Sequence, residues 1–227
     1  MLRPPRNIEH RNQEGDVDMT GGPVNGEAGW ELLRSIDDDD GSGLESGYIF
    51  HPLDLRQLST VRDLSVFRGL RSDLPTLIIS ECCLCYLDVD VARDVLKWFE
   101  DRIPSLGVIL YEPIGVEDSF GQMMVDNLAA RGITMPTVQR YRSLRDQVER
   151  LKDLGFGAEA GGANAITIKD IWDKWITPEE RERVDGLEGL DEVEEWQMLA
   201  RHYAVAWGWR GINDWETWQN FQQASGG

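Results

Sequence analysis

Three carboxylates stand where apolar, strand-like stretches of the sequence end. Asp54 follows GYIFHPL, Glu81 follows LPTLIIS, and Glu112 ends LGVILYE. Ligands of open α/β sheets bind just beyond the carboxyl ends of the strands, so we expect the three acids to line one rim. Any one acid alone is equally explained as a polar residue that meets water where a strand stops. The three together favour a binding site, with Asp54 and Glu81 facing a common cavity at the carboxyl ends of adjacent parallel strands.

Asp54 and the residue after it suggest what this site binds. The Asp54 carboxylate accepts hydrogen bonds, and Leu55 beside it offers an apolar surface. Adenine and ribose donate hydrogen bonds from amino and hydroxyl groups, and the adenine ring prefers an apolar wall. The pair therefore suits a nucleoside.

All three cysteines of the chain crowd into one segment directly after Glu81. A zinc site needs four converging ligands, yet Cys82 and Cys83 are adjacent and the histidines are distant in sequence. A nucleophilic cysteine needs a neighbouring base or cation, whereas Glu81 and Asp88 would raise its pKa. We therefore expect packing residues, with no disulfide pair, no bound metal and at least two side chains largely buried among Cys82, Cys83 and Cys85.

The elements that must position these residues form an α/β pattern. Residues 74–80 and 106–112 are continuous apolar runs, typical of strands buried on both faces of a parallel sheet. Between them, residues 88–104 place apolar side chains at helical spacing and end at a proline. This strand, helix, strand unit predicts two parallel strands, and residues 47–53 predict a further strand ahead of them.

The remainder is expected to be mostly helical. Caps and glycine stops predict helices over 118–132 and 143–155, and others from Thr177 and from about Asp191, before a closing strand at YAVAWGW.

The sequence GFGAEA matches a dinucleotide-binding pattern, but it follows a helix rather than a strand. Gly155 is therefore interpreted as a helix C-cap.

Charge excludes two classes of partner. The chain has 227 residues, 41% of them hydrophobic, and 23 basic against 41 acidic residues give a formal net charge of −18. Nucleic acids and anionic membranes are polyanions and are disfavoured as partners. No apolar run reaches the roughly 18 residues of a membrane-spanning helix, and the first residues lack the apolar core of a signal peptide, so we expect a soluble, cytoplasmic protein. Residues 1–46 are acidic and poor in apolar residues, which predicts a disordered tail or a surface loop.

Several sequence blocks, in order, carry a resemblance to a known family. The blocks PLDLRQL, SECCLCYL, LYEPIGVEDSFGQMMVDNL, SLRDQVERLKDLGF and EEWQMLARHYAVAWGW resemble the second half of the leucine carboxyl methyltransferase family. The resemblance implies an enzyme that uses S-adenosyl-L-methionine to methylate the C-terminal leucine carboxylate of the type 2A protein phosphatase catalytic subunit. It also implies the C-terminal part of a Rossmann-like class I methyltransferase sheet with a helical lid over residues 47–211, followed by a tail at 212–227.

The family's functional residues can be placed on this chain only where its motifs match. By this resemblance, Asp54 and Leu55 hold the adenine end of the cofactor, and Glu81 is a further cofactor ligand. Tyr86 falls where the family places a tyrosine near the reacting carboxylate. No catalytic residue is assigned, because a carboxylate is already ionised near neutral pH and methyl transfer needs no general base.

The first half of the family pattern has no counterpart in this sequence, which predicts an N-terminally truncated chain. That half carries the family's glycine-rich turn and the basic residues that meet the substrate carboxylate. Arg56 and Arg62 are the basic residues nearest the expected site in sequence. Two functions therefore stay open at this point: a leucine carboxyl methyltransferase, and a non-catalytic, phosphatase-associated fragment without cofactor binding.

Overall fold

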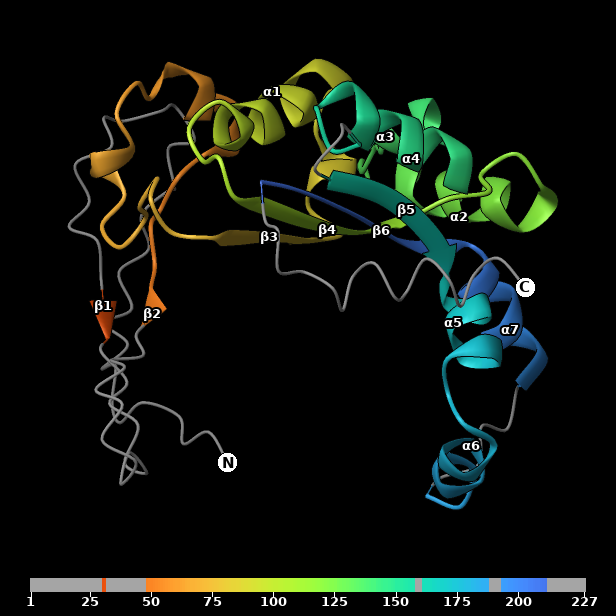
Figure 1. Ribbon diagram of the computed structural model, residues 1–227. Coiled ribbons are helices and arrows are strands. Elements are labelled where there is room, and N and C mark those ends of the chain that lie inside the picture. Colours follow the sequence, from red (N-terminus) through yellow and green to blue (C-terminus); the bar gives the residue numbers. More distant parts are fainter. Residues whose placement is uncertain (1–29, 32–47, 158–160, 188–192, 212–227) are drawn as a thin grey trace, which may run out of the picture. The chain divides into compact units, whose positions relative to one another are not determined.

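The protein is described from a computed structural model (Figure 1), which describes residues 30–31, 48–157, 161–187 and 193–211. Its contacts divide the chain into two units, Met1–Pro52 and Leu53–Gly227. Apart from Trp30–Glu31, the expected acidic tail lies outside the described residues, as does the expected C-terminal tail. The predicted domain boundary at residue 47 stays a prediction.

The first unit contains a two-stranded sheet. Strand β1 (Trp30–Glu31) pairs antiparallel with β2 (Tyr48–Ile49). The strand expected over 47–53 is therefore short, and it is not part of the larger sheet. The expectation that Asp54 follows a parallel neighbour of the 74–80 strand is wrong, because the pattern of GYIFHPL does not specify which strand it pairs with.

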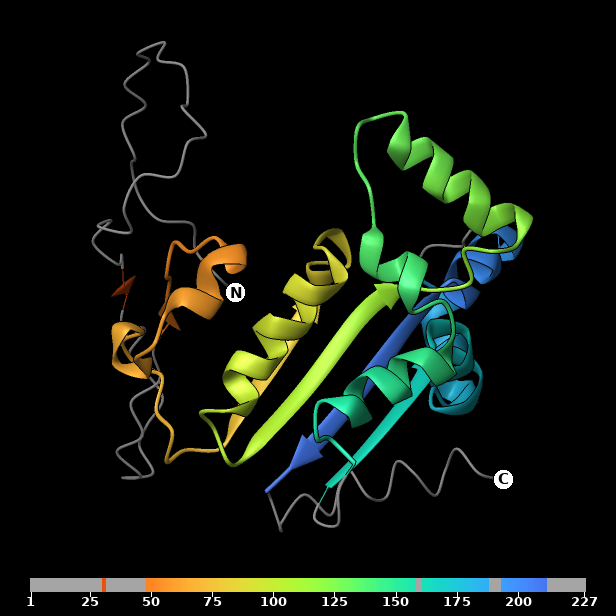
Figure 2. The same cartoon turned by 90° about the horizontal axis from the view of Figure 1, so that it is seen from above.

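The second unit is built on a four-stranded sheet with the order β3-β4-β6-β5. Its two leading strands pair in parallel as expected, whereas β6 runs antiparallel between β4 and β5 (Figure 2). The α/β class expected from the sequence is confirmed. The strands are β3 (Thr76–Glu81), β4 (Leu106–Pro113), β5 (Gly161–Thr167) and β6 (Tyr203–Arg210).

Helices begin where the sequence supplies side-chain caps. Asp118, Ser143 and Thr177 each accept a hydrogen bond from a backbone N–H of the first turn, and Ser143 forms the expected capping box with Asp146. Gly155 follows the C-cap of α4 with φ +83°, as expected of a helix-ending glycine. The α-helices are α1 (Val89–Glu100), α2 (Ser119–Ala129), α3 (Pro136–Arg140), α4 (Leu144–Asp153), α5 (Ile168–Lys174), α6 (Pro178–Asp185) and α7 (Val193–Arg201). The 3₁₀ helices are η1 (Leu55–Thr60), η2 (Leu64–Val66) and η3 (Leu84–Tyr86).

The main core lies between one face of the sheet and the helices that cover it (Figure 1). Alternate residues of β4, including Val108 and Leu110, face Leu96 of α1 and Leu151 of α4, and all four are buried. Burial of side chains of this size contributes about 1.5–3 kcal/mol each, so this layer fixes the strand ends that carry the candidate site. None of the described helices is long and apolar enough to cross a bilayer.

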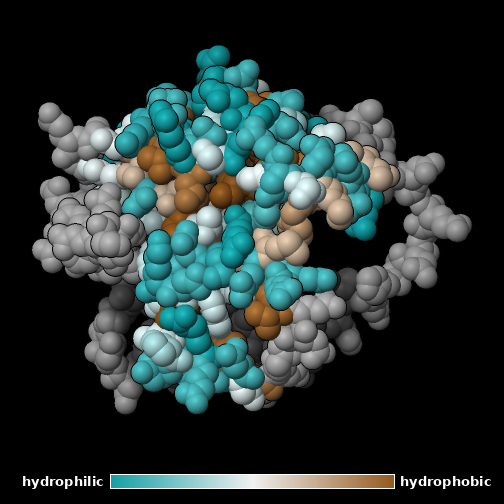
Figure 3. All heavy atoms as spheres, turned by 90° about the vertical axis from the view of Figure 1, so that its right-hand side faces the viewer, coloured by the Kyte–Doolittle hydropathy of each residue, from teal (hydrophilic) through white to brown (hydrophobic). Residues whose placement is uncertain are grey.

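The opposite face of the sheet is covered unevenly. Near β5 and β6, Trp207 and Ile166 are buried, and Trp175, the C-cap of α5, packs against them. At β3, by contrast, Leu77 and Ile79 expose 41% and 68% of their surface. Figure 3 shows the side of the molecule with α5 and α7, where scattered apolar residues interrupt a mainly hydrophilic surface.

Strand β3 also presents its backbone at the edge of the sheet. Thr76 and Cys82 donate backbone hydrogen bonds toward β4, so the alternate residues Leu77, Ile79 and Glu81 point their N–H groups the other way. These three have no backbone partner within the part of the chain that the structure describes. An exposed, apolar strand edge is a template for pairing with another chain.

We predict that Ile79→Lys reduces self-association of the 227-residue chain, because a charge on an edge strand opposes edge-to-edge pairing. Sedimentation velocity over a range of concentrations would measure this. Leu199→Lys, at a position of α7 that is 45% exposed, is the matched control. Equal effects of the two lysines would show that added charge, rather than the β3 edge, controls association.

Candidate functional site

Glu81 lies at the carboxyl end of β3, as expected from the sequence. It is exposed, and in the parallel register it stands beside Tyr111 of β4. The next residue, Cys82, has φ +43°, a left-handed conformation that costs a non-glycine residue energy, and its N–H donates to Tyr111 O at 2.9 Å. The chain therefore turns sharply away from the sheet immediately after the Glu81 carboxylate.

The short helix after this turn carries Tyr86 and is held in place by α3. The Thr137 hydroxyl is buried within hydrogen-bond distance of two backbone carbonyls, those of Leu84 (3.1 Å) and Leu87 (2.8 Å). Tyr86 itself is 45% exposed. A free phenol is thus presented near the end of β3 on a fixed segment, and burial raises the pKa of Tyr86, so its hydroxyl stays protonated at neutral pH.

Glu112 does not share the open rim, which corrects the sequence expectation. Its side chain is 1% exposed on the helix-covered face, and its Oε2 lies 2.7 Å from Nη1 of Arg150 in α4. Gln147 lies 3.5 Å from the same oxygen, and the Arg150 guanidinium lies 4.8 Å from the centre of the Tyr141 ring. Side chains alternate between the faces of a strand, so Tyr111 and Glu112 necessarily point in opposite directions.

Asp54 begins the 3₁₀ helix η1 and does not end a strand of the large sheet. Its carboxylate accepts from the Arg56 backbone N–H at 3.0 Å and from the Arg56 guanidinium at 2.9 and 2.6 Å. These hydrogen bonds lower the pKa of Asp54. Leu55 is half-buried against the main core. The nucleoside-binding role of both residues stays a prediction, and in this structure Arg56 occupies the carboxylate that the role requires.

Two further tyrosines lie at this end of the sheet: Tyr111, paired in register with Glu81, near the end of β4, and Tyr203 at the start of β6. The rings of Tyr111 and Tyr203 stack with their centres 5.3 Å apart and an interplanar angle of 20°. Burial raises the pKa of both phenols. Neither tyrosine is among the site residues predicted from the sequence, although both occupy strand-end positions, in LYEP and RHYAV.

The cysteines differ from their expected burial. All three are free, but only Cys85 is buried, Cys82 is half-buried and Cys83 is exposed, so the expectation of two largely buried side chains is wrong. The left-handed turn at Cys82 exposes this segment instead of continuing the strand. Burial first, and then the charge of Glu112, raises the pKa of each thiol, to about 12 for Cys85, which disfavours the reactive thiolate at neutral pH.

A histidine and an aspartate lock the loop after β4. His202 lies with Nε2 2.9 Å from the Asp118 carboxylate and Nδ1 2.7 Å from the Met198 carbonyl, to which it must donate. Asp118 also caps α2 through the Gly121 N–H at 2.8 Å, and this bond and the one from His202 lower its pKa. The start of α2 is thereby tied to the residue that precedes Tyr203.

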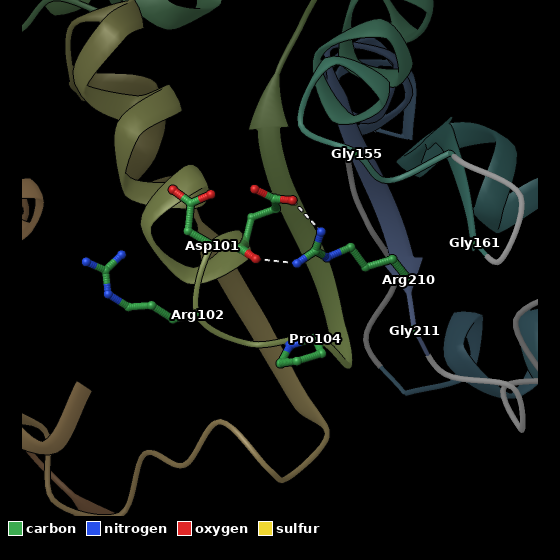
Figure 4. A pocket seen from close by; sticks show the side chains of 8 residues that line it. Asp101, Arg102, Pro104, Gly155, Gly161, Arg210 and Gly211 are labelled. Carbon is green, nitrogen blue, oxygen red and sulfur yellow. Dashed lines mark hydrogen bonds and ion pairs between the residues drawn. The ribbon is translucent and has the colours of Figure 1, made fainter. Parts of the chain in front are cut away.

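A hollow of about 410 Å³ lies at the other end of the sheet (Figure 4). Arg210, paired in register with the first residue of β4, donates there to the Glu100 carboxylate and to the Glu100 carbonyl. It lies at the amino end of the parallel strands, opposite the rim where ligands of such sheets bind. The hollow is lined by Glu100, Asp101, Arg102, Pro104, Gly155, Gly161, Arg210 and Gly211.

Sequence comparison identifies the relatives of this chain. No family model matches it. It is 44% identical over 194 residues to leucine carboxyl methyltransferase 1 of Aspergillus fumigatus, covering 75% of this chain and 48% of the relative. It is related to the leucine carboxyl methyltransferases. The Emericella nidulans protein is 42% identical (76% and 49% covered), and the Arabidopsis thaliana homologue is 33% identical (79% and 52% covered).

The chain spans about half the length of the curated leucine carboxyl methyltransferases that it matches. Among solved structures, a putative methyltransferase from Thermobifida fusca is 15% identical with a TM-score of 0.44, over 70% of this chain and 53% of that one. A Haemonchus contortus phosphoethanolamine N-methyltransferase 2 in complex with S-adenosylhomocysteine gives 12% identity and a TM-score of 0.38, over 67% and 37%. Likeness at this level carries no argument about function.

The geometry makes the carboxyl end of β3 and β4 the candidate site of this chain, with Glu81, Tyr86, Tyr111 and Tyr203. Asp54 and Leu55 belong to η1, which packs against α1. In the described ranges, no group of three or more His, Cys, Asp or Glu side chains is placed to hold a metal ion.

The buried ion pair behind the site yields a prediction about stability. Glu112 Oε1 and Arg150 Nη2 are buried without a hydrogen-bond partner, so removal of one charge leaves the other poorly compensated. We predict that Arg150→Met lowers the free energy of unfolding by about 3–5 kcal/mol. Urea denaturation followed by circular dichroism would measure the change.

The double variant Glu112→Leu/Arg150→Met is the matched control. It removes both charges, and replacement of a buried pair by apolar residues is often nearly neutral. We expect it to be more stable than Arg150→Met alone. The reverse order would contradict the view that an uncompensated charge causes the loss.

Proposed function

We propose that this chain forms part of an S-adenosylmethionine-dependent enzyme that methylates the C-terminal leucine carboxylate of the type 2A protein phosphatase catalytic subunit. The observation that carries the proposal is the 44% identity to leucine carboxyl methyltransferase 1 over three quarters of the chain. The cytoplasm is the proposed location of this reaction.

The chemistry of the rim residues fits the proposed cofactor. Its ribose hydroxyls need an acceptor, and Glu81 offers an exposed carboxylate at the carboxyl end of β3. Its adenine needs an apolar wall and an acceptor, which the predicted pair Leu55 and Asp54 would supply after Arg56 releases the carboxylate. When bound, the cofactor supplies an electrophilic methyl group on sulfur.

The protein's part in such a reaction is alignment. A leucine carboxylate, with a pKa of about 3.5, is ionised at neutral pH, so no general base is required. The residues around the site need only orient the carboxylate oxygen and exclude water. Tyr86 is the residue proposed to donate a hydrogen bond to the acceptor carboxylate, since it keeps its proton at neutral pH.

A second candidate is a non-catalytic, phosphatase-associated form that does not bind the cofactor. The engagement of Asp54 by four hydrogen bonds from Arg56 favours it, because the carboxylate expected to hold the nucleoside is already satisfied. The two candidates differ in cofactor binding.

We predict that the 227-residue chain binds S-adenosylmethionine and that Glu81→Gln weakens binding about tenfold or more. Loss of a hydrogen bond to a charged acceptor costs about 1.5–3 kcal/mol, which corresponds to a factor of about 10–100. Isothermal titration calorimetry measures both affinities.

Glu182→Gln, an exposed position in α6, is the matched control and should bind like the unchanged protein. Absence of binding by the unchanged chain would favour the non-catalytic candidate. Equal affinities of the two glutamine variants would remove Glu81 from the site.

A further inference from the structure

The stacked pair Tyr111–Tyr203 is an aromatic surface at the end of the sheet that no role assigned so far uses. In the antiparallel register, Tyr111 faces Val205 and Tyr203 faces Pro113, so the two rings come from neighbouring strands and meet diagonally. Their centres are 5.3 Å apart, the interplanar angle is 20°, and both side chains are half-buried. Two strands and the His202–Asp118 contact beside them hold this surface rigidly.

The electrostatic environment of these rings is negative. Glu81 stands beside Tyr111 in the register, and its exposed carboxylate forms no ion pair with any described residue. The buried cation Arg150 is paired with Glu112 on the other face of the sheet. Burial first, and then the charges of Glu112 and Glu81, raise the pKa of the Cys82 thiol, in line with an environment that disfavours anions.

Together these features describe a subsite for a compact cation. Aromatic faces attract cations through the ring quadrupole, and onium groups are recognised by aromatic side chains in this way. We infer that Tyr111 and Tyr203, with Glu81 beside them, bind the sulfonium group of S-adenosylmethionine, an inference that rests on the proposed function.

The subsite would separate cofactor from product by charge. In methyl transfer, a lone pair of the carboxylate oxygen forms the new C–O bond, the C–S bond breaks, and its electron pair stays on sulfur. The sulfonium cation becomes a neutral thioether, which loses its attraction to the rings and to Glu81. The rings therefore favour the charged cofactor over S-adenosylhomocysteine and promote exchange of the product.

The experiment compares the affinities of S-adenosylmethionine and S-adenosylhomocysteine by calorimetry, and the readout is their ratio. The two ligands share every group except the methyl and the charge. A cation–π contribution of about 0.5–2 kcal/mol corresponds to a preference of about 2- to 30-fold for the cation. We expect the unchanged chain to show such a preference.

The variants Tyr111→Leu and Tyr203→Leu remove an aromatic face and are expected to lose most of the preference. Tyr111→Phe and Tyr203→Phe keep the ring and should retain it. Circular dichroism and thermal unfolding check that each variant folds. Folded leucine variants that bind both ligands with an unchanged ratio would overturn the inference and favour contact of the rings with the substrate leucine.

Glu81→Gln provides a second arm at an exposed position, where folding is not at risk. Loss of a ribose hydrogen bond weakens both ligands equally, whereas loss of the nearby charge weakens only the cation. We expect the ratio to fall in this variant, and an unchanged ratio would count against the subsite. Failure of the unchanged chain to bind either ligand would instead overturn the proposed function, and with it the inference.

Discussion

The ion pair between Glu112 and Arg150 fixes the end of β4, and the geometry of the candidate site depends on that end. The pair is buried, with an Oε2–Nη1 distance of 2.7 Å, and it joins the carboxyl end of β4 to α4. Because side chains alternate along a strand, placing Glu112 under α4 places Tyr111 on the other face. The Tyr111 carbonyl then accepts from the Cys82 N–H at 2.9 Å, which sets the turn after Glu81.

Strand β6 adds the second half of the site from far along the chain. It enters between β4 and β5 in the antiparallel direction, so its first residue, Tyr203, arrives at the end of β4 where Tyr111 stands. His202 just before it contacts Asp118 at the cap of α2, which ties the loop after β4 to the same corner. Sheet topology, rather than any local motif, thus assembles the aromatic pair.

The sequence predicted those features that depend on local physical chemistry. Continuous apolar runs identified β3 and β4, and caps at Asp118, Ser143 and Thr177 identified three helix starts, because each pattern is satisfied within a few residues. Strand β5 was missed, since its seven residues, GGANAIT, carry two glycines and little strand-forming content and acquire their burial from β6.

The misplaced acids show why the site was harder to predict than the fold. Glu112 finds its partner 38 residues away in α4, and no spacing rule reveals such a pair. The partner of Asp54 is local, since Arg56 lies two residues further along the chain. An arginine at this spacing after an aspartate is therefore a sequence signal that the carboxylate accepts hydrogen bonds from within the chain. Glu81 lies at the strand end predicted for it, because the apolar run before it defines β3, and its role as a cofactor ligand stays a prediction.

The central claim is that the carboxyl ends of β3 and β4 form the binding site for S-adenosylmethionine. Titration of the ¹⁵N-labelled chain with this compound, followed by amide chemical shifts, tests it most directly. We expect saturable shifts at Cys82, Tyr111 and Tyr203 and unchanged resonances at Arg210 and Gly211, which line the hollow at the opposite end of the sheet. Saturable shifts confined to that hollow, or no shifts in a folded protein, would contradict it.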